Sequence, residues 1–273
     1  MRSRAPAIAI NVVLAVLAAL TLFPLARMVS ASLMAPGEAS SFPPPLLPRA
    51  PSLANYRELF ATVGIGRQIL NSLMVSVGAT LLSLTFNLAA GYAFAKLRFA
   101  GRERVFRALL GALVIPAQVT MMPLFLMLKE MGLVNTYAGA LVPWLASVFG
   151  IFLVRQYALS IPDELIEAAR MDGAGEGRIF VSIVLPLLKP VIVTLTVLIF
   201  LGAWNDFMWP LIVLTDHDLQ TLPVALSGLS REHVQDTELM MAGAVITVVP
   251  VLALFLALQR YYMQGLLLGS VKG

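Results

Sequence analysis

Long apolar runs separated by short polar segments dominate this chain. A helix needs about 20 mostly apolar residues to cross the hydrocarbon core of a membrane. Six segments meet that requirement: residues 8–29, 69–95, 105–128, 137–154, 190–214 and 240–258. Barrel strands alternate in polarity and are only about 10 residues long, whereas these runs are continuously apolar. The pattern therefore predicts an all-α integral membrane protein with six transmembrane helices, in one domain over residues 1–273.

The basic residues predict how these helices are oriented. With the N-terminus inside, 13 of the 19 Lys and Arg residues fall on the cytoplasmic segments, where basic residues are normally in excess. We therefore expect both termini in the cytoplasm, a cytoplasmic loop at residues 155–189, and outer loops at residues 30–66 and 215–239. The first apolar run is too long for a signal peptide, whose core has about 7–15 residues, which favours a retained anchor over a cleaved leader.

Composition agrees with a membrane protein and excludes several other classes. Apolar residues make up 59% and charged residues 12%, against about half and a quarter in soluble domains. The net charge of +4 is explained by the loops, so we expect no nucleic-acid partner. The absence of cysteine excludes disulfides and thiolate chemistry, and no phosphate-binding or hydrolase motif is present. We expect no catalytic site, no metal site and no cofactor in this chain.

The most distinctive polar stretch is Glu167–Pro186, EAARMDGAGEGRIFVSIVLP. Ser160 is a candidate cap for a helix that precedes it, and Gly173 suits the left-handed residue that ends such a helix. A second short helix is expected over residues 176–184, closed by Pro186. The sequence thus predicts a helix–glycine–helix elbow beside the membrane. Its carboxylates could bind arginines of a partner; an amphipathic helix lying on the membrane is the simpler alternative.

The spacing E-A-A-x3-G-x9-I-x-L-P in this stretch resembles the signature loop of the membrane-spanning subunits of bacterial ABC importers. The segment Trp204–Leu211, WNDFMWPL, and the tail from Gln259 onward are similar to sugar permeases of the maltose type. The resemblance covers essentially the whole chain. It departs at Leu266–Leu268, where relatives more often carry smaller or polar residues, which leaves the depth of tail insertion open.

The resemblance implies a type I importer permease of the bacterial or archaeal inner membrane that moves a sugar or sugar-like solute by alternating access. The implied partners are a second homologous permease, two ATPase subunits that hold ATP and Mg, and an extracytoplasmic solute-binding protein. The residues implied at the ATPase contact are Glu167, Ala168, Ala169, Asp172, Gly173, Leu185 and Pro186. Those implied at the ATPase interface of the tail are Gln264, Gly265, Gly269 and Lys272.

Polar residues inside two of the spans are candidates for the translocation path. Asn205 and Asp206 lie in the fifth span and Asn87 in the second. An ionisable group in a membrane span is costly and is by default a functional hypothesis. Helix packing or an interfacial position is the alternative for each, and in the maltose-type pattern sugar contacts come mainly from the partner permease.

A self-contained secondary transporter or channel is the alternative function. Such a protein needs its own coupling-ion site, usually at broken helices, and Asp206 alone gives little support for one. A membrane-embedded enzyme is a more distant alternative, because the spans contain no nucleophile–base pair.

Overall fold

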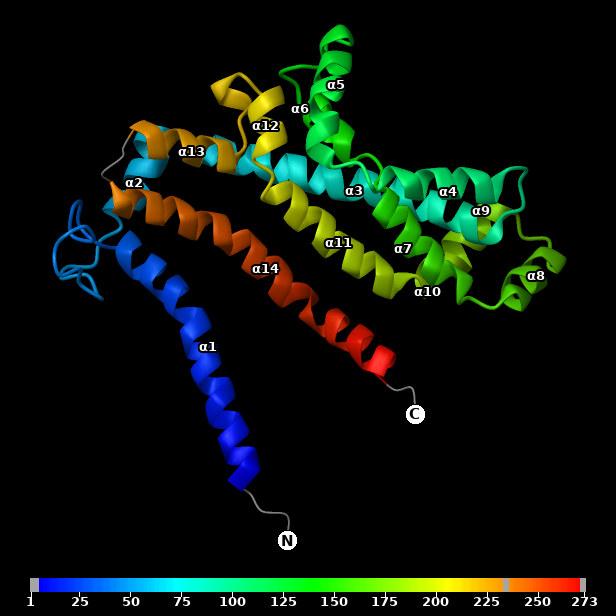
Figure 1. Ribbon diagram of the computed structural model, residues 1–273, viewed down its shortest axis with the longest axis horizontal. Coiled ribbons are helices and arrows are strands. Elements are labelled where there is room, and N and C mark those ends of the chain that lie inside the picture. Colours follow the sequence, from blue (N-terminus) through cyan, green and yellow to red (C-terminus); the bar gives the residue numbers. More distant parts are fainter. Residues whose placement is uncertain (1–4, 233–235, 271–273) are drawn as a thin grey trace. The chain divides into compact units, whose positions relative to one another are not determined.

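The computed structural model describes residues 5–232 and 236–270, and within these ranges the chain is helical and contains no strand (Figure 1). The predicted all-α class is therefore confirmed. The elements, in chain order, are α1 (Ala5–Ser32), α2 (Ala54–Glu58), the π-helix η1 (Leu59–Val63), α3 (Gly66–Lys96), α4 (Arg102–Ala112), α5 (Ala117–Glu130), α6 (Tyr137–Leu141), η2 (Val142–Trp144), α7 (Val148–Leu159), α8 (Asp163–Met171), α9 (Glu176–Ile179), the π-helix η3 (Phe180–Val184), α10 (Leu185–Leu187), α11 (Lys189–Trp204), α12 (Met208–Val213), η4 (His217–Leu219), α13 (Leu222–Glu232) and α14 (Thr237–Ser270).

The helices form two compact units. The first combines the chain up to Arg67 with Ala225–Pro250, and the second combines Gln68–Val224 with the segment from Val251 onward. In the first unit the loop after α1 is fixed by side chains that bind its backbone. Asn55, which is fully buried, donates to the carbonyls of Ser32 and Met34, both at 2.9 Å.

Three described helices are long and apolar enough to cross a membrane, and three bent helix pairs also qualify. The unbroken candidates are Ile10–Ser32, Gly66–Lys96 and Thr237–Ala257. The bent pairs are Arg102–Ala112 with Ala117–Glu130 (103°), Tyr137–Trp144 with Val148–Leu159 (46°) and Glu176–Leu187 with Lys189–Trp204 (79°). The six-span count stays a prediction, because it requires each bent pair to act as one span.

Three of the predicted apolar runs are interrupted, and the run at residues 137–154 breaks between Trp144 and Val148. The run at residues 105–128 breaks before Pro116, because a proline disfavours helical backbone in the residue that precedes it; Pro116 itself has an extended backbone, with ψ of 135°. The run at residues 190–214 stops at Trp204 and resumes at Met208. These three predicted spans are therefore not single continuous helices.

The core of the second unit gathers around α7 and α11. Val154 of α7 and Leu195 of α11 are buried in one apolar cluster, together with Ile166 of α8 and Ile179 of α9. On α3, Gly91 faces Val154 so closely that a β-carbon at Gly91 would lie 2.5 Å from the Val154 β-carbon. Small residues let membrane helices approach at this range, and the contact fixes α3 against α7.

We expect Gly91→Leu to separate α3 from α7 and to destabilise the protein, because overpacking typically costs about 1–3 kcal/mol. Gly111→Ala is the matched control: an added β-carbon there meets no atom within 4 Å. Thermal unfolding of the purified protein in detergent measures the stability of both variants relative to wild type. A Gly91→Leu midpoint equal to wild type would contradict the close α3–α7 packing.

Candidate functional site: the cytoplasmic elbow

The elbow is built on α8, a helix of nine residues that is separated from α7 by the short segment 160–162. Ser160 does not cap this helix, contrary to the prediction. Its hydroxyl donates to the carbonyl of Tyr157 at 2.7 Å and so completes the end of α7. Pro162 precedes α8 directly, and Asp163 and Glu164 occupy the first turn, where negative charge is favourable.

Lys96, the last residue of α3, fixes the start of α8. Its side chain is only 5% exposed, and its ammonium donates to the Ile161 carbonyl and to the Asp163 carboxylate, both at 2.6 Å. The hydrogen bond from Lys96 holds the pKa of Asp163 below its usual value. A buried ammonium is costly unless it is paired and hydrogen-bonded, so these contacts define where the elbow leaves the helix bundle.

Gly173 ends α8 as predicted, with a left-handed φ of 80°. The N–H of Ala174 bonds to the carbonyl of Ala169 and the N–H of Gly173 to that of Arg170, both at 3.0 Å. This pair of bonds is a Schellman motif, in which a left-handed residue satisfies the last carbonyls of the helix. A residue with a β-carbon would be strained at this point.

A second set of side chains fixes the other arm of the elbow. Arg170 of α8 binds Glu176 of α9, with Nε and Oε1 2.7 Å apart, and this bond raises the pKa of Arg170. The other oxygen of Glu176 accepts from the hydroxyl of Tyr92 at 2.9 Å. Because Tyr92 belongs to α3, one long helix holds both arms.

Beyond α9 the structure corrects the predicted second helix. The helical path continues through η3 and α10 and breaks at Leu188, with a bend of 79° into α11. Pro186 does not close the helix but lies in the first turn of α10, where a missing N–H is tolerated. Leu185 is partly buried against the apolar cluster, whereas Pro186 is exposed.

One face of α8 is open. Glu167, Ala168, Asp172 and Gly173 are exposed, Ala169 is partly buried, and Ile166 turns into the core with 3% exposure. Two apolar side chains flank this face: Met171 is 84% exposed and Leu165 47%. Sequence reasoning missed them, because an apolar residue next to an acid gives no signal on its own. The structure thus brings the predicted acids together with apolar side chains on one exposed face.

The predicted tail residues lie at the edge of what the structure describes. The backbone of Gln264, Gly265 and Gly269 is in α14, and Lys272 lies outside the described residues.

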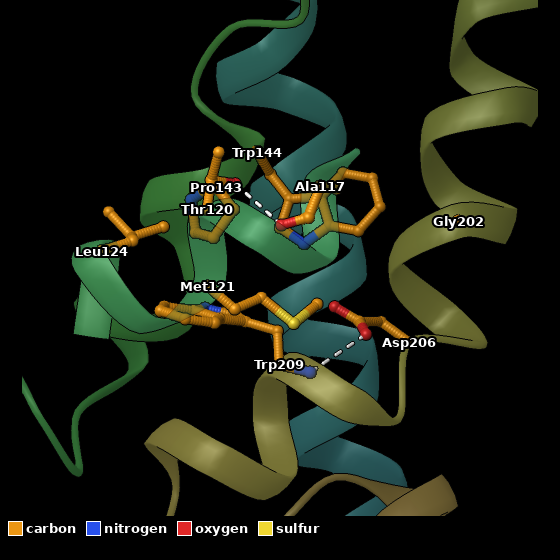
Figure 2. Close-up of a pocket in the computed structure, with 9 residues that line it drawn as sticks. All are labelled: Ala117, Thr120, Met121, Leu124, Pro143, Trp144, Gly202, Asp206 and Trp209. Carbon is orange, nitrogen blue, oxygen red and sulfur yellow. Dashed lines mark hydrogen bonds between the residues drawn. The ribbon is translucent and has the colours of Figure 1, made fainter. Parts of the chain in front are cut away.

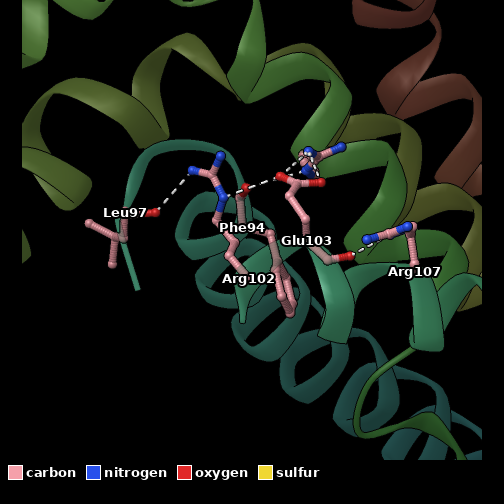
Figure 3. Close-up of polar contacts among 6 residues, drawn as sticks. Phe94, Leu97, Arg102, Glu103 and Arg107 are labelled. Atoms are coloured by element: carbon pink, nitrogen blue, oxygen red, sulfur yellow. Dashed lines mark hydrogen bonds and ion pairs between the residues drawn. The ribbon is translucent and has the colours of Figure 1, made fainter. Parts of the chain in front are cut away.

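The turn between α3 and α4 is strongly basic. Arg98, Arg102, Arg104 and Arg107 line a surface hollow of about 710 Å³. Figure 3 shows the contacts that order this turn, including the bond from Arg102 to the Leu97 carbonyl at 3.1 Å. Basic residues are normally in excess on the cytoplasmic side of membrane proteins, and the sequence-based prediction places this turn there.

Arg155 of α7 connects to the same turn. Its guanidinium binds Glu103 at 3.1 Å and the Phe94 carbonyl at 3.2 Å, and lies 4.2 Å from the centre of the Phe106 ring. These contacts join α7 to α3 and α4.

The three predicted path residues have different environments. Asn87 is fully buried: its oxygen accepts from the Ser147 N–H at 2.9 Å, and its amide donates to the Ser83 hydroxyl at 3.0 Å. Asn205 is exposed and donates to the Leu201 carbonyl of its own helix at 2.9 Å. Asp206 is partly buried at the break between α11 and α12. Asn87 therefore has the geometry of a packing residue, whereas Asp206 lines a cavity described below.

The chain is helical, has segments apolar enough to cross a membrane and carries an exposed elbow. These are the features expected of an importer permease. Residues 87–267 match the family of binding-protein-dependent transport system inner membrane components, and this chain belongs to that family. It is a permease subunit of an ATP-driven ABC importer.

Similar proteins align with nearly the whole length of this chain. The arabinooligosaccharides transport system permease protein AraQ of Halalkalibacterium halodurans is 38% identical over 95% of this chain and 94% of its own. The melibiose/raffinose/stachyose import permease protein MelC of Bacillus subtilis is 34% identical over 97% and 96%. A chain from the crystal structure of a bacterial ABC transporter involved in the import of the acidic polysaccharide alginate is 25% identical, with a TM-score of 0.84 over 96% and 98%.

We expect Asn87→Leu to lower the stability of the permease by about 1–3 kcal/mol, because it leaves the buried Ser147 N–H without an acceptor. Uptake per correctly folded molecule should be unchanged if Asn87 only packs helices. Thermal unfolding and uptake normalised to folded protein separate the two roles. A variant that is as stable as wild type but has lost uptake would show that Asn87 acts in the translocation path and not only in helix packing.

Proposed function

We propose that this chain forms one half of the pathway by which an ABC importer moves a sugar across the cytoplasmic membrane, and that α8 is its docking point for an ATPase. The observation that carries the proposal is the exposed face of α8, held at one end by Lys96 and at the other by Gly173. Sugar as the substrate class is supported by the two relatives named for oligosaccharides.

The face of α8 suits a protein partner in both charge and shape. Glu167 and Asp172 offer carboxylates to basic side chains of the ATPase, and Ala168 and Gly173 leave room for close approach. Met171, which is 84% exposed, supplies a flexible apolar side chain that fits an irregular cleft. Leu185 and Pro186 lie beyond η3, where Leu185 supports the elbow from the core.

Movement of α8 reaches the membrane helices through fixed contacts. Lys96 and Tyr92 connect the elbow to α3, and the helical path through η3 and α10, bent at Leu188, connects it to α11. When ATP closes the ATPase dimer, α8 moves with it and the helices open outward; hydrolysis returns them. The energy comes from the tighter binding of ATP to the closed dimer.

The proposed assembly contains a second homologous permease, two ATPase subunits that bind ATP and Mg, and an extracytoplasmic solute-binding protein. Both termini of this chain lie in the cytoplasm, and Gln264, Gly265, Gly269 and Lys272 lie at the ATPase interface. The permease itself requires no cofactor. Membership of the family supports the proposed partners, and the basic turn at the α3–α4 end supports the proposed orientation.

Glu167→Lys should separate the ATPase from the permease. Removing a charge-assisted hydrogen bond costs about 1.5–3 kcal/mol, which lowers the affinity about 10-fold to 100-fold. Co-purification from membranes, quantified by mass spectrometry, measures the ATPase retained by each variant, and uptake should fall in parallel.

Glu130→Lys is the matched control, since it makes the same charge change at an exposed residue of α5; it should retain the ATPase. Equal ATPase recovery with Glu167→Lys and wild type would overturn docking through this face.

A further inference from the structure

A cavity of about 320 Å³ lies in the second unit, beside the break between α11 and α12 (Figure 2). It is lined from one side by Thr120 and Met121 of α5, from another by Trp144, and from the third by Gly202, Asp206 and Trp209. Its volume is at the lower end of the range for small-molecule sites, about 300–1,000 Å³. The ATPase-docking face does not involve any of these residues.

The aromatic walls of the cavity are held in place. The indole N–H of Trp209 donates to the Gly139 carbonyl at 3.1 Å in the protein interior. Trp144 packs against the backbone of Gly202, where a β-carbon would lie 2.9 Å from the indole ring. Because Gly202 has no side chain, the Trp144 ring can pack directly against its backbone. The ring is partly exposed and lines the cavity.

Asp206 supplies the polar wall. One of its oxygens accepts from the Trp209 N–H at 3.4 Å, and the Met208 N–H and the Trp144 side chain also donate to the carboxylate. A carboxylate has about four acceptor positions, so with these donors in place Asp206 can still accept from a sugar hydroxyl. In Figure 2 its carboxylate points toward the side of the cavity that holds Trp144 and Met121. Among the described residues that line the cavity, Asp206 is the only ionisable one.

We propose that this cavity is a subsite for an uncharged sugar ring, so that this chain binds the transported solute directly. The inference rests on the proposed function and specifies its substrate class. A sugar ring has an apolar C–H face and a rim of hydroxyl groups, and the cavity presents an indole beside a hydrogen-bond acceptor. The negative face of an indole attracts C–H groups, and Asp206 accepts hydrogen bonds from hydroxyls.

The same arrangement disfavours other occupants. An acyl chain would leave the carboxylate of Asp206 in an apolar environment, which is costly. A phosphorylated or acidic sugar would bring a second negative charge close to Asp206, and the described lining offers no basic residue to offset it. The subsite therefore selects for neutral sugars as well as binding them.

The absence of cysteine from the chain allows a direct test. Thr120→Cys places one thiol at the cavity of the complete importer, assembled in membranes with both permeases, the ATPases and the binding protein. Arabinotriose and raffinose serve as uncharged probes and trigalacturonate as the acidic one. Whichever uncharged sugar is taken up should slow maleimide labelling of the variant severalfold, and trigalacturonate should not.

Val114→Cys is the control for labelling, since Val114 is 83% exposed and outside the cavity; its reaction should be independent of sugar. Uptake of an uncharged sugar without protection at position 120 would overturn the subsite and leave the proposed function standing. Absence of uptake of either uncharged sugar would overturn the proposed sugar class itself. Protection by trigalacturonate would overturn the selection for neutral sugars.

Asp206→Asn removes the charge of the carboxylate but keeps a side-chain oxygen that can accept from the Trp209 N–H. We expect the half-saturating concentration of the sugar for uptake to rise about tenfold, as for a lost hydrogen bond to a charged group. ATPase recovery should stay at the wild-type level.

Met121→Ala and Met122→Ala form a matched pair, since Met121 lines the cavity and Met122, 64% exposed, does not. Only Met121→Ala should weaken sugar uptake. If Asp206→Asn and Met121→Ala both transport like wild type, the subsite is overturned.

Discussion

The bonds made by the Lys96 ammonium are the constraint on which the position of the elbow depends. A helix as short as α8 is marginal in water on its own, so its position must come from tertiary contacts. The Lys96 side chain is almost completely buried, and two of its three donors bind one backbone carbonyl and one carboxylate at the start of α8. Moving α8 away from α3 would leave a buried charge without partners, which is far costlier than breaking an exposed ion pair.

Under the proposed function, this constraint explains how the exposed face of α8 would transmit movement of the ATPase. A docking surface on a mobile loop would absorb movement of the ATPase in its own backbone. Here α8 is fixed by Lys96 at its start, and its end is joined through Arg170 and Glu176 to Tyr92 of the same long helix. The elbow and α3 therefore respond to a partner as one body.

Sequence reasoning identified the elements whose signals are local. The glycine at the end of α8 and the apolar segments both depend on residues close together in the chain. The elbow boundaries were less well predicted, because Ser160 and Pro186 are compatible with either the end or the start of a helix. Lys96 and Tyr92 could not be connected to the elbow, since their partners lie 67 and 84 positions away and no local periodicity reports such contacts. The cavity was missed for the same reason: Asp206 was noticed, but Trp144 and Met121 come from other helices.

The break after Trp204 connects the two sites. Backbone that is not helical is tolerated at membrane depth only where protein buries it or where it lines a cavity, and the break at Asn205–Phe207 borders such a cavity. The helix that ends there, α11, starts at the bend after Leu188, next to the elbow. Its 16 residues span about 24 Å, so a single helix has the elbow at one end and the cavity at the other. A change in the tilt of α11 alters the distance between Gly202 and Trp144, whose contact defines one wall of the cavity. The permease fold is shared by importers of acidic and of neutral solutes, and a fold alone does not determine a substrate. Under the proposed function, the charge at the end of α11 is therefore where selectivity would change without altering the coupling path.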